Sequence, residues 1–307
     1  MGVALSDAEA SVVSPFTSLD KSISSVVEIL KEGRCALASA LVSYKFIIIY
    51  GQIESMNQII NAYFHVNFSE WCWVFMDGFW VIGMSFTLPL AKAQDKLAPA
   101  RPTSSLLGAH TMSSALGVLF INYFWTILGL VALFQQDWFQ CRQWTNTDVS
   151  NLNIIGDNYE AQTVFIITAS QYMSTAAAFN YGYEFRQAWY KNYWFVSLAT
   201  FYIVIQIFVL LVPSQLACLW RINCENENVL YSIVQGRHVP IQNDWNTNLI
   251  PMSFRWVLLV IIILNALSTS GWDYFVVNGT RKRLGAKKRG QILKGMKTPD
   301  TDLSDLV

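Results

Sequence analysis

The sequence predicts an all-α membrane protein with six transmembrane helices, and composition is the first reason. Of the 307 residues, 53% are hydrophobic and 14% are charged, whereas soluble domains are about 25% charged. The chain is also rich in aromatic residues, with 12 Trp, 13 Tyr and 19 Phe. Trp and Tyr favour the boundary between membrane and water. In addition, six apolar stretches reach the roughly 20 residues that a helix needs to cross a bilayer.

The six apolar stretches are separated by polar segments. The first two are joined only by the short segment His65–Glu70, so they are expected to form an antiparallel hairpin. Pro213 lies inside the fifth stretch and predicts a kink, because proline removes a backbone donor. The expected spans are Ala38–Phe64, Trp71–Leu90, Leu106–Phe134, Ala161–Tyr181, Trp194–Leu219 and Met252–Val276.

Lysine and arginine are distributed unequally between the two sides of these spans. An excess of basic residues marks the cytosolic side, and an even number of spans then places both termini in the cytosol. The opposite loops receive only Arg142, Arg221 and Arg237. The basic side receives Lys21, Lys31, Arg34, Lys45, Lys92, Lys96, Arg101, Arg186, Lys191 and the cluster Arg281–Arg289.

The two ends of the chain differ from the membrane region. Residues 1–33 predict a short strand at Gly2–Leu5 and an amphipathic helix at Ser22–Lys31, which we interpret as the edge of a soluble domain. Residues 34–277 form the predicted six-helix transmembrane domain. Residues 278–307 form a cytosolic tail, in which the basic cluster either enforces orientation or binds anionic lipid headgroups. Its last part, Thr298–Val307, is expected to be disordered.

The first span carries a stripe of polar residues. Tyr50, Glu54, Asn57 and Asn61 follow one another at helical spacing, so they share one face. Such a face can pack against neighbouring helices through hydrogen bonds. However, a carboxylate near the bilayer centre costs about 2.5–3.5 kcal/mol and usually holds something. We therefore expect this face to line a cation site.

The second span carries Asp77, with Trp73 four residues before it and Trp80 three residues after it. An acid beside indole faces suits an organic ammonium, which gains both charge pairing and a cation–π contact. The alternative is that the tryptophans anchor the helix at the interface and Asp77 caps a loop. The residues predicted to bind the cation are Tyr50, Glu54, Asn57, Asp77 and Trp80.

Several classes of chemistry are not expected from this chain. Its five cysteines show no CxxC or Cys/His spacing, so neither zinc nor another metal site is predicted. A disulfide among Cys141, Cys218 and Cys224 is compatible with their place on the non-cytosolic side, and the sequence does not choose the pair. No phosphate-binding Gly-rich loop, Ser/His/Asp set or phosphorylatable Asp-Lys-Thr-Gly is present. No catalytic residue is therefore assigned, and nucleic-acid binding is not expected.

Six segments resemble type V P-type ATPases. The start, Gly2-Val-Ala-Leu-Ser-Asp-Ala-Glu-Ala-Ser-Val-Val-Ser-Pro-Phe-Thr-Ser18, is similar to the segment that follows the Gly-Asp-Gly-Ala-Asn-Asp hinge of their phosphorylation domain. Glu32-Gly-Arg-Cys-Ala-Leu37 resembles the beginning of their fifth transmembrane helix. Four short segments resemble the eighth transmembrane helix of these ATPases and its flanks: Asp157-Asn-Tyr-Glu160, Gln171-Tyr172, Ala176-Ala-Ala178 and Phe185-Arg186. The pattern is most similar to subgroup B, whose members move polyamines from the late endosomal or lysosomal lumen into the cytosol.

This resemblance implies that the chain is the carboxy-terminal membrane part of such an ATPase. The six spans would be helices five to ten, and residues 1–33 would be the end of the phosphorylation domain and its stalk. The phosphorylated Asp and the site for ATP and Mg would lie in the missing amino-terminal part, so this chain alone would not hydrolyse ATP. The implied partners are that part, membrane lipids and a polyamine or other cation, in an endosomal, lysosomal or vacuolar membrane.

Two other interpretations share the same spans. The chain could be a stand-alone membrane protein without enzymatic activity, either a channel or an assembly partner. Residues 1–33 disfavour this, because they fit a domain edge better than an independent terminus. It could also belong to a type V enzyme of subgroup A, which handles misinserted transmembrane segments. That activity would need a large cavity with less localised negative charge.

Overall fold

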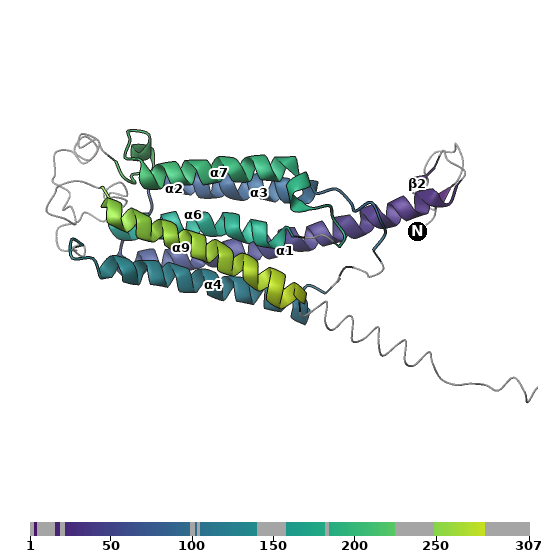
Figure 1. Ribbon diagram of the computed structural model, residues 1–307, viewed down its shortest axis with the longest axis horizontal. Helices are drawn as coiled ribbons and strands as arrows, with labels where there is room; N and C mark the ends of the chain where they lie inside the picture. The colour runs from purple at the N-terminus through teal and green to yellow at the C-terminus, as the bar shows by residue number, and fades with distance from the viewer. Residues whose placement is uncertain are drawn as a thin grey trace, which may run out of the picture.

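A computed structural model shows a bundle of long helices lying side by side (Figure 1). It describes residues 3–4, 16–18, 22–98, 102, 105–139, 158–181, 184–224 and 249–279. The predictions for Cys141, for the basic cluster Arg281–Arg289 and for the tail Thr298–Val307 lie outside these residues. The all-α class predicted from the sequence is confirmed.

Helix α1, Ser24–Phe64, is a single helix of 41 residues, about 60 Å long at 1.5 Å per residue. Its first half projects beyond the bundle, and strands β1 (Val3–Ala4) and β2 (Phe16–Thr17) pair in parallel near its tip (Figure 1). The predicted amphipathic helix and the first span are thus continuous through Gly33. A rigid rod joins the outlying amino-terminal segment to the centre of the bundle.

The predicted hairpin partner of α1 is helical from Glu70 to Leu90, but its geometry changes along its length. It comprises α2 (Glu70–Trp73), the π-helix η1 (Val74–Val81), α3 (Ile82–Thr87) and the 3-10 turn η2 (Leu88–Leu90). α1 ends in a left-handed residue, His65, with φ 54°. π-helical turns are rare and often mark functional sites, and this one contains Asp77.

Five of the described helices are long and apolar enough to cross a membrane. These are α1, the helix Glu70–Leu90, α4 (Ala109–Phe134), α7 (Tyr193–Leu211) and α9 (Met252–Gly271) with its π-helical continuation η6 (Trp272–Asn278). Two further 3-10 turns are η4 (Trp189–Lys191) and η5 (Ala217–Leu219). Many large apolar side chains of the five apolar helices are exposed on the surface of the bundle, as expected for contact with lipid.

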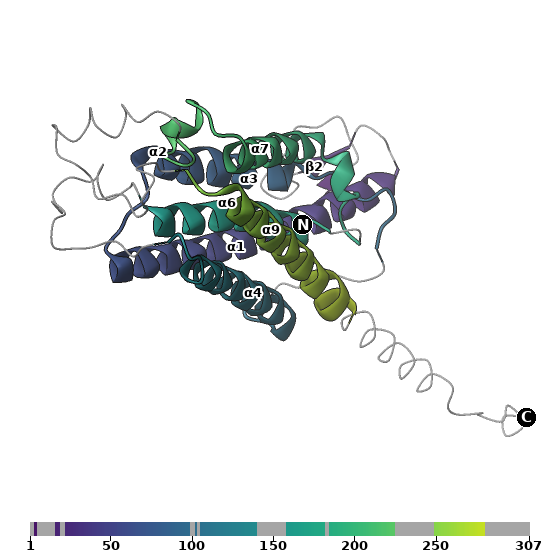
Figure 2. The same ribbon diagram turned by 60° about the vertical axis from the view of Figure 1, so that its left-hand side comes forward.

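The remaining long helix, α6 (Tyr159–Phe179), lies in the middle of the bundle, between the layer of α2, α3 and α7 and the layer of α1, α4 and α9 (Figure 2). All of its residues except Met173 and Ala177 are buried. Because its neighbours cover it, α6 can carry many polar side chains. It has the length of a span without meeting the apolarity of the other five, so six spans remain a prediction.

The polar side chains of α6 bond to the helices around it. Asn122 of α4 donates to Thr175 Oγ1 at 3.1 Å and accepts from Asn265 Nδ2 of α9 at 3.0 Å. Gln171 Nε2 donates to the Asn122 carbonyl at 2.8 Å. These contacts are structural hydrogen bonds that join α6 to α4 and α4 to α9.

The fifth span is shorter than the sequence prediction. α7 ends at Leu211 and does not continue through a kink at Pro213 to Leu219. Pro213 has no backbone N–H for the Val209 carbonyl, so the helix cannot propagate. Instead Asn223 Nδ2 donates to the carbonyls of Val209 and Leu210 at 2.9 and 3.0 Å. A side chain from the following loop thus caps the helix.

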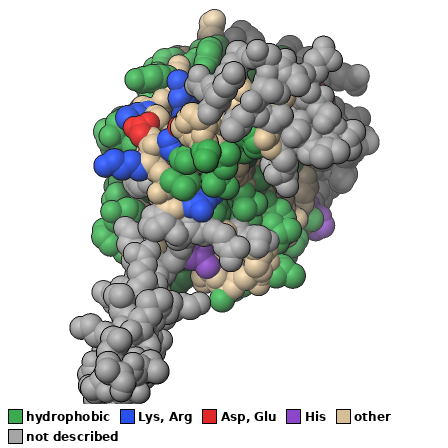
Figure 3. Space-filling view, turned by 90° about the vertical axis from the view of Figure 1, so that its right-hand side faces the viewer, with side chains coloured by type: hydrophobic (Ala, Val, Ile, Leu, Met, Phe, Trp, Pro, Cys, Tyr) green, Lys and Arg blue, Asp and Glu red, His purple; other side chains and the backbone are tan. Residues whose placement is uncertain are grey.

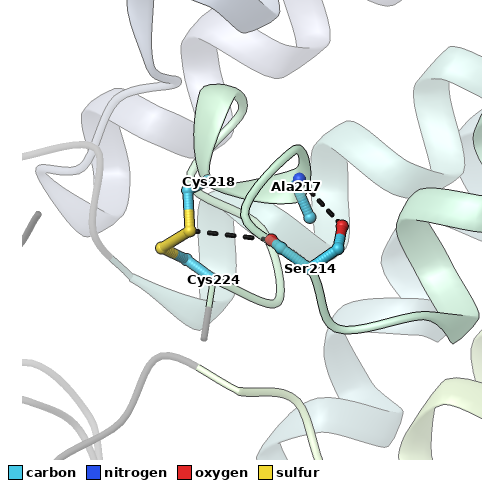
Figure 4. The surroundings of a disulfide bond; sticks show 4 residues. All are labelled: Ser214, Ala217, Cys218 and Cys224. Carbon is cyan, nitrogen blue, oxygen red and sulfur yellow. Dashed lines mark hydrogen bonds between the residues drawn. A yellow bond between two sulfur atoms is a disulfide. The ribbon is translucent and has the colours of Figure 1, made fainter. Parts of the chain in front are cut away.

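That loop is closed by a disulfide between Cys218 and Cys224 (Figure 4). The structure thereby chooses one pair among the three candidates. Cys218 and Cys224 are six residues apart, and the loop between them contains two left-handed residues, Arg221 and Asn223. The disulfide therefore holds Asn223 in the conformation in which it caps α7.

Replacing both Cys218 and Cys224 with Ser is expected to lower the free energy of unfolding by about 2 kcal/mol, as the loop-entropy relation gives for a short loop. Thermal unfolding in detergent micelles, followed by Trp fluorescence, measures the change. A reductant should lower the midpoint of the unsubstituted protein and leave the double variant unchanged. A reduced protein that unfolds at its original temperature would contradict this role.

Candidate cation site

The carboxylate of Asp77 is positioned by the π-helix η1 and meets α1. Tyr50 Oη of α1 donates a hydrogen bond to Asp77 Oδ1. Asp77 is exposed on the surface of the described bundle, while Tyr50 is half-buried. A carboxylate facing hydrocarbon would cost about 2.5–3.5 kcal/mol on insertion scales. In a membrane this side of the bundle is therefore better suited to protein, water or a cation than to lipid.

Glu54 lies on α1 one turn beyond Tyr50 and points toward α6. Tyr172 Oη of α6 donates to Glu54 Oε1, whereas Glu54 Oε2 is buried without a hydrogen bond to any described residue. Glu54 is close enough to Asp77 for the two charges to repel each other. A cation placed near them would relieve this repulsion.

The two tyrosines connect the two carboxylates. The rings of Tyr50 and Tyr172 meet edge to face, with centroids 5.5 Å apart. Asp77, Tyr50, Tyr172 and Glu54 thus form a continuous row, which we call the tyrosine bridge. The sequence prediction included three of these residues and omitted Tyr172. No sequence signal pointed to Tyr172, because only the packing of α6 against α1 brings it to Glu54.

Two asparagines extend the row along α1. Asn57 is 0% exposed and Asn61 is 2% exposed. Asn57 interacts electrostatically with Glu54, yet neither of its amide atoms makes a hydrogen bond of ordinary geometry to a described residue. The same holds for both amide atoms of Asn61. The polar stripe predicted for the first span therefore faces the inside of the bundle.

The two tryptophans near Asp77 pack among aromatic rings. Trp80 is 5% exposed and lies 5.6 Å from Tyr202 and 5.8 Å from Phe165 between ring centroids. The Trp73 ring lies 5.2 Å from Phe68. The two Trp80 contacts pack η1 against α6 and α7, so in this structure Trp80 positions the helix that carries Asp77.

A second charged cluster joins α1 to α4 and η6. Lys45 Nζ donates to Ser114 Oγ at 2.8 Å and lies 3.9 Å from Asp273 Oδ1. Ser114 Oγ also donates to Asp273 Oδ1, and Lys45 Nζ lies 4.0 Å above the Phe179 ring. Lys45, assigned to the basic side in the orientation argument, is therefore a buried partner of Asp273. Asp273 is an acid inside an apolar span, a signal the sequence interpretation did not use.

The two ends of the bundle differ in charge. At the end from which α1 projects, Lys and Arg side chains gather on the surface (Figure 3), and Lys31, Arg34 and Lys96 line a groove there. Below it Arg186 is 1% exposed, and burial lowers the pKa of Arg186 to about 10. Its Nη2 donates to the Phe179 carbonyl at 3.3 Å, where a positive charge complements the helix dipole. The disulfide lies at the opposite end.

No group of three His, Cys, Asp or Glu side chains that could hold a metal ion occurs in the described residues. The acids described above are paired with hydroxyls or with Lys45 instead. The arrangement offers hydroxyl and carboxylate oxygens, which accept hydrogen bonds from an ammonium group.

Known proteins with similar sequences are ATPases. Human polyamine-transporting ATPase 13A3 is 32% identical over 248 residues, which cover 72% of this chain and 20% of that protein. Human polyamine-transporting ATPase 13A2 is 31% identical over 229 residues, covering 70% and 18%. Probable cation-transporting ATPase 13A4 of Gallus gallus is 29% identical over 223 residues, covering 64% and 18%. No family model matches the chain.

The chain spans about a fifth of the length of these relatives. The similarity covers most of the chain and agrees with the resemblance noted in the sequence. Together with the five apolar helices, it identifies an integral membrane protein whose relatives are P-type ATPases of the 13A family.

Proposed function

We propose that this chain is the carboxy-terminal membrane part of a subgroup B type V P-type ATPase and supplies part of its polyamine site. The observation that carries the proposal is the tyrosine bridge, which links Asp77 to Glu54 through the contacting rings of Tyr50 and Tyr172. Two carboxylates that repel each other bind a protonated amine better than a neutral solute. A protonated amine has N–H donors and no acceptor, so the bound amine would donate hydrogen bonds to Glu54 and Asp77.

The orientation we propose has the basic end in the cytosol. Cytosolic loops carry excess Lys and Arg, and disulfides persist in oxidising compartments. The groove lined by Lys31 lies at the end of the bundle from which α1 projects. The Cys218–Cys224 disulfide lies in the loop after α7, at the opposite end. Both arguments support cytosolic termini and a disulfide facing the lumen of an endosome, lysosome or vacuole.

ATP and Mg would be bound by other parts of the ATPase. The described residues of this chain gather no carboxylates fit to hold a divalent ion. The chain would instead receive movement through α1, which is unbroken from Ser24 to Glu54 and beyond. Thirty residues of helix span about 45 Å, so rotation of a domain at its amino end would shift Tyr50 and Glu54 relative to Asp77.

The experiment is substitution of Asp77 by Asn in the full-length polypeptide, with amine-stimulated ATP hydrolysis as the readout. The amine concentration that gives half-maximal stimulation is expected to rise about tenfold or more. A hydrogen bond to a charged group contributes about 1.5–3 kcal/mol, and about 1.4 kcal/mol corresponds to a factor of ten.

Asp95→Asn is the matched control, because Asp95 is an exposed acid outside the bundle's interior. It should leave the amine dependence unchanged. Equal stimulation of the Asp77→Asn variant and the unsubstituted protein at every amine concentration would remove Asp77 from the site and refute the proposal.

A further inference from the structure

The inner face of α1 carries buried polar atoms that lack hydrogen bonds of ordinary geometry to the protein. Glu54 Oε2 and both amide atoms of Asn61 make no such bond to a described residue, and Asn57 interacts with Glu54 without either amide atom making one. Asn57 and Asn61 are at most 2% exposed. An unsatisfied buried polar group costs about 1–3 kcal/mol, and buried polar groups in native proteins normally have a protein or water partner. Three such residues in a row therefore need an explanation beyond packing.

Glu54, Asn57 and Asn61 lie on one face of α1. They stand at positions i, i+3 and i+7, and so share one face. From Glu54 to Asn61 the face runs about 10 Å along the helix axis. It stops one turn before the end of α1 at Phe64. The row thus leads from the tyrosine bridge toward that end of the bundle.

That end is also the disulfide end. Just beyond the turn after α1, Ser69 Oγ and Cys72 Sγ donate to the carbonyl of Trp220, at 3.1 and 3.4 Å. Trp220 lies inside the loop that the disulfide closes. The polar row therefore runs toward the disulfide loop, on the side assigned to the lumen.

The row is bordered by apolar side chains on the same helix. Ile53 is 1% exposed and Ile60 is 7% exposed. Along the helix axis, Ile53 lies at the level of Glu54 and Ile60 at the level of Asn61. Amide groups on such a helix offer both donors and acceptors without a net charge. They can replace water around a passing ammonium ion and do not trap it as a second carboxylate would.

We propose that Glu54, Asn57 and Asn61 form a hydrated path along which a protonated alkylamine reaches the tyrosine bridge from the disulfide end. The path rests on the proposed function, to which it adds the side chains that line the access to the site. Asn61 is the outermost lining residue and Glu54 is the innermost.

Cysteine accessibility tests the path in the full-length polypeptide in sealed vesicles. Asn61→Cys and Ile60→Cys lie at the same depth and are both buried. A membrane-impermeant cationic methanethiosulfonate, added on the disulfide side, should modify N61C about tenfold or more faster than I60C, because only a hydrated thiol ionises and reacts. Spermine should slow the modification of N61C. Labelling of the unsubstituted protein, whose Cys35 and Cys72 are buried, is subtracted.

Equal slow labelling of N61C and I60C would overturn the path. Fast labelling of N61C that spermine does not slow would overturn the passage of amine. If N61C does not fold, Asn57→Cys is compared with Ile60→Cys, which lies nearer the disulfide end and should nevertheless be modified more slowly. The Asp77→Asn experiment measures ATP hydrolysis instead, so failure of the path and failure of the proposed function give different results.

Discussion

Replacing Lys45 with Met is expected to lower the free energy of unfolding by about 3–5 kcal/mol, the usual cost of removing one partner of a buried ion pair. Lys45 is 9% exposed and Asp273 is 5% exposed. Without the ammonium, the Asp273 carboxylate would keep the hydroxyl of Ser114 and a 3.4 Å contact with Asn278 Nδ2. Those neutral donors do not compensate a charge in a low-dielectric interior.

Thermal unfolding in detergent, followed by Trp fluorescence, gives the change, and two variants separate its causes. Lys31→Met removes another lysine of α1. Lys31 Nζ lies 2.7 Å from Glu28 Oε1, and the Glu28 side chain is 65% exposed. Such surface pairs contribute about 0–1 kcal/mol, so little change is expected. The double variant Lys45→Met with Asp273→Asn should recover most of the loss, because no uncompensated charge remains. A single variant as stable as the unsubstituted protein would show that Asp273 finds another partner.

Replacing Asn223 with Ala is expected to lower the free energy of unfolding by about 3 kcal/mol or more. Besides its two bonds to the end of α7, its Oδ1 accepts from the backbone N–H of Ile250 at 3.0 Å. Asn223 is 0% exposed, so three buried backbone groups would lose their partner, each at about 1–3 kcal/mol. The loss should be large because Pro213 already deprives Val209 of its normal donor.

Asn223→Gly separates the hydrogen bonds from the backbone conformation. Asn223 has φ 49°, which glycine adopts freely and alanine adopts at a cost of roughly 1–2 kcal/mol. The glycine variant should therefore lie between Asn and Ala in unfolding temperature. If Gly matches Asn, the backbone conformation alone matters and the side-chain cap contributes nothing.

Several features of this protein were readable in the sequence because they depend on local composition. The length and apolarity of α1, α4 and α9 follow from the hydrophobic stretches. The short turn after Phe64 requires the antiparallel hairpin. The helical spacing of Tyr50, Glu54 and Asn57 fixes one face whatever packs against it. The limits of α7 were set wrongly, because the prediction extended the helix through Pro213 where a distant Asn223 completes its end.

The pairing of these faces could only come from the tertiary structure. Nothing in the sequence links Lys45 to Asp273, 228 positions later, or brings Tyr172 to Glu54. The sequence also could not show that Cys218 forms its disulfide with Cys224, or that Trp80 packs against Tyr202. The sequence by itself determined which segments are helical, membrane-embedded and acidic, since those properties arise from neighbouring residues. Which acid faces a tyrosine, which a lysine and which the bundle surface depends on how separate helices pack, and that was decided only in three dimensions.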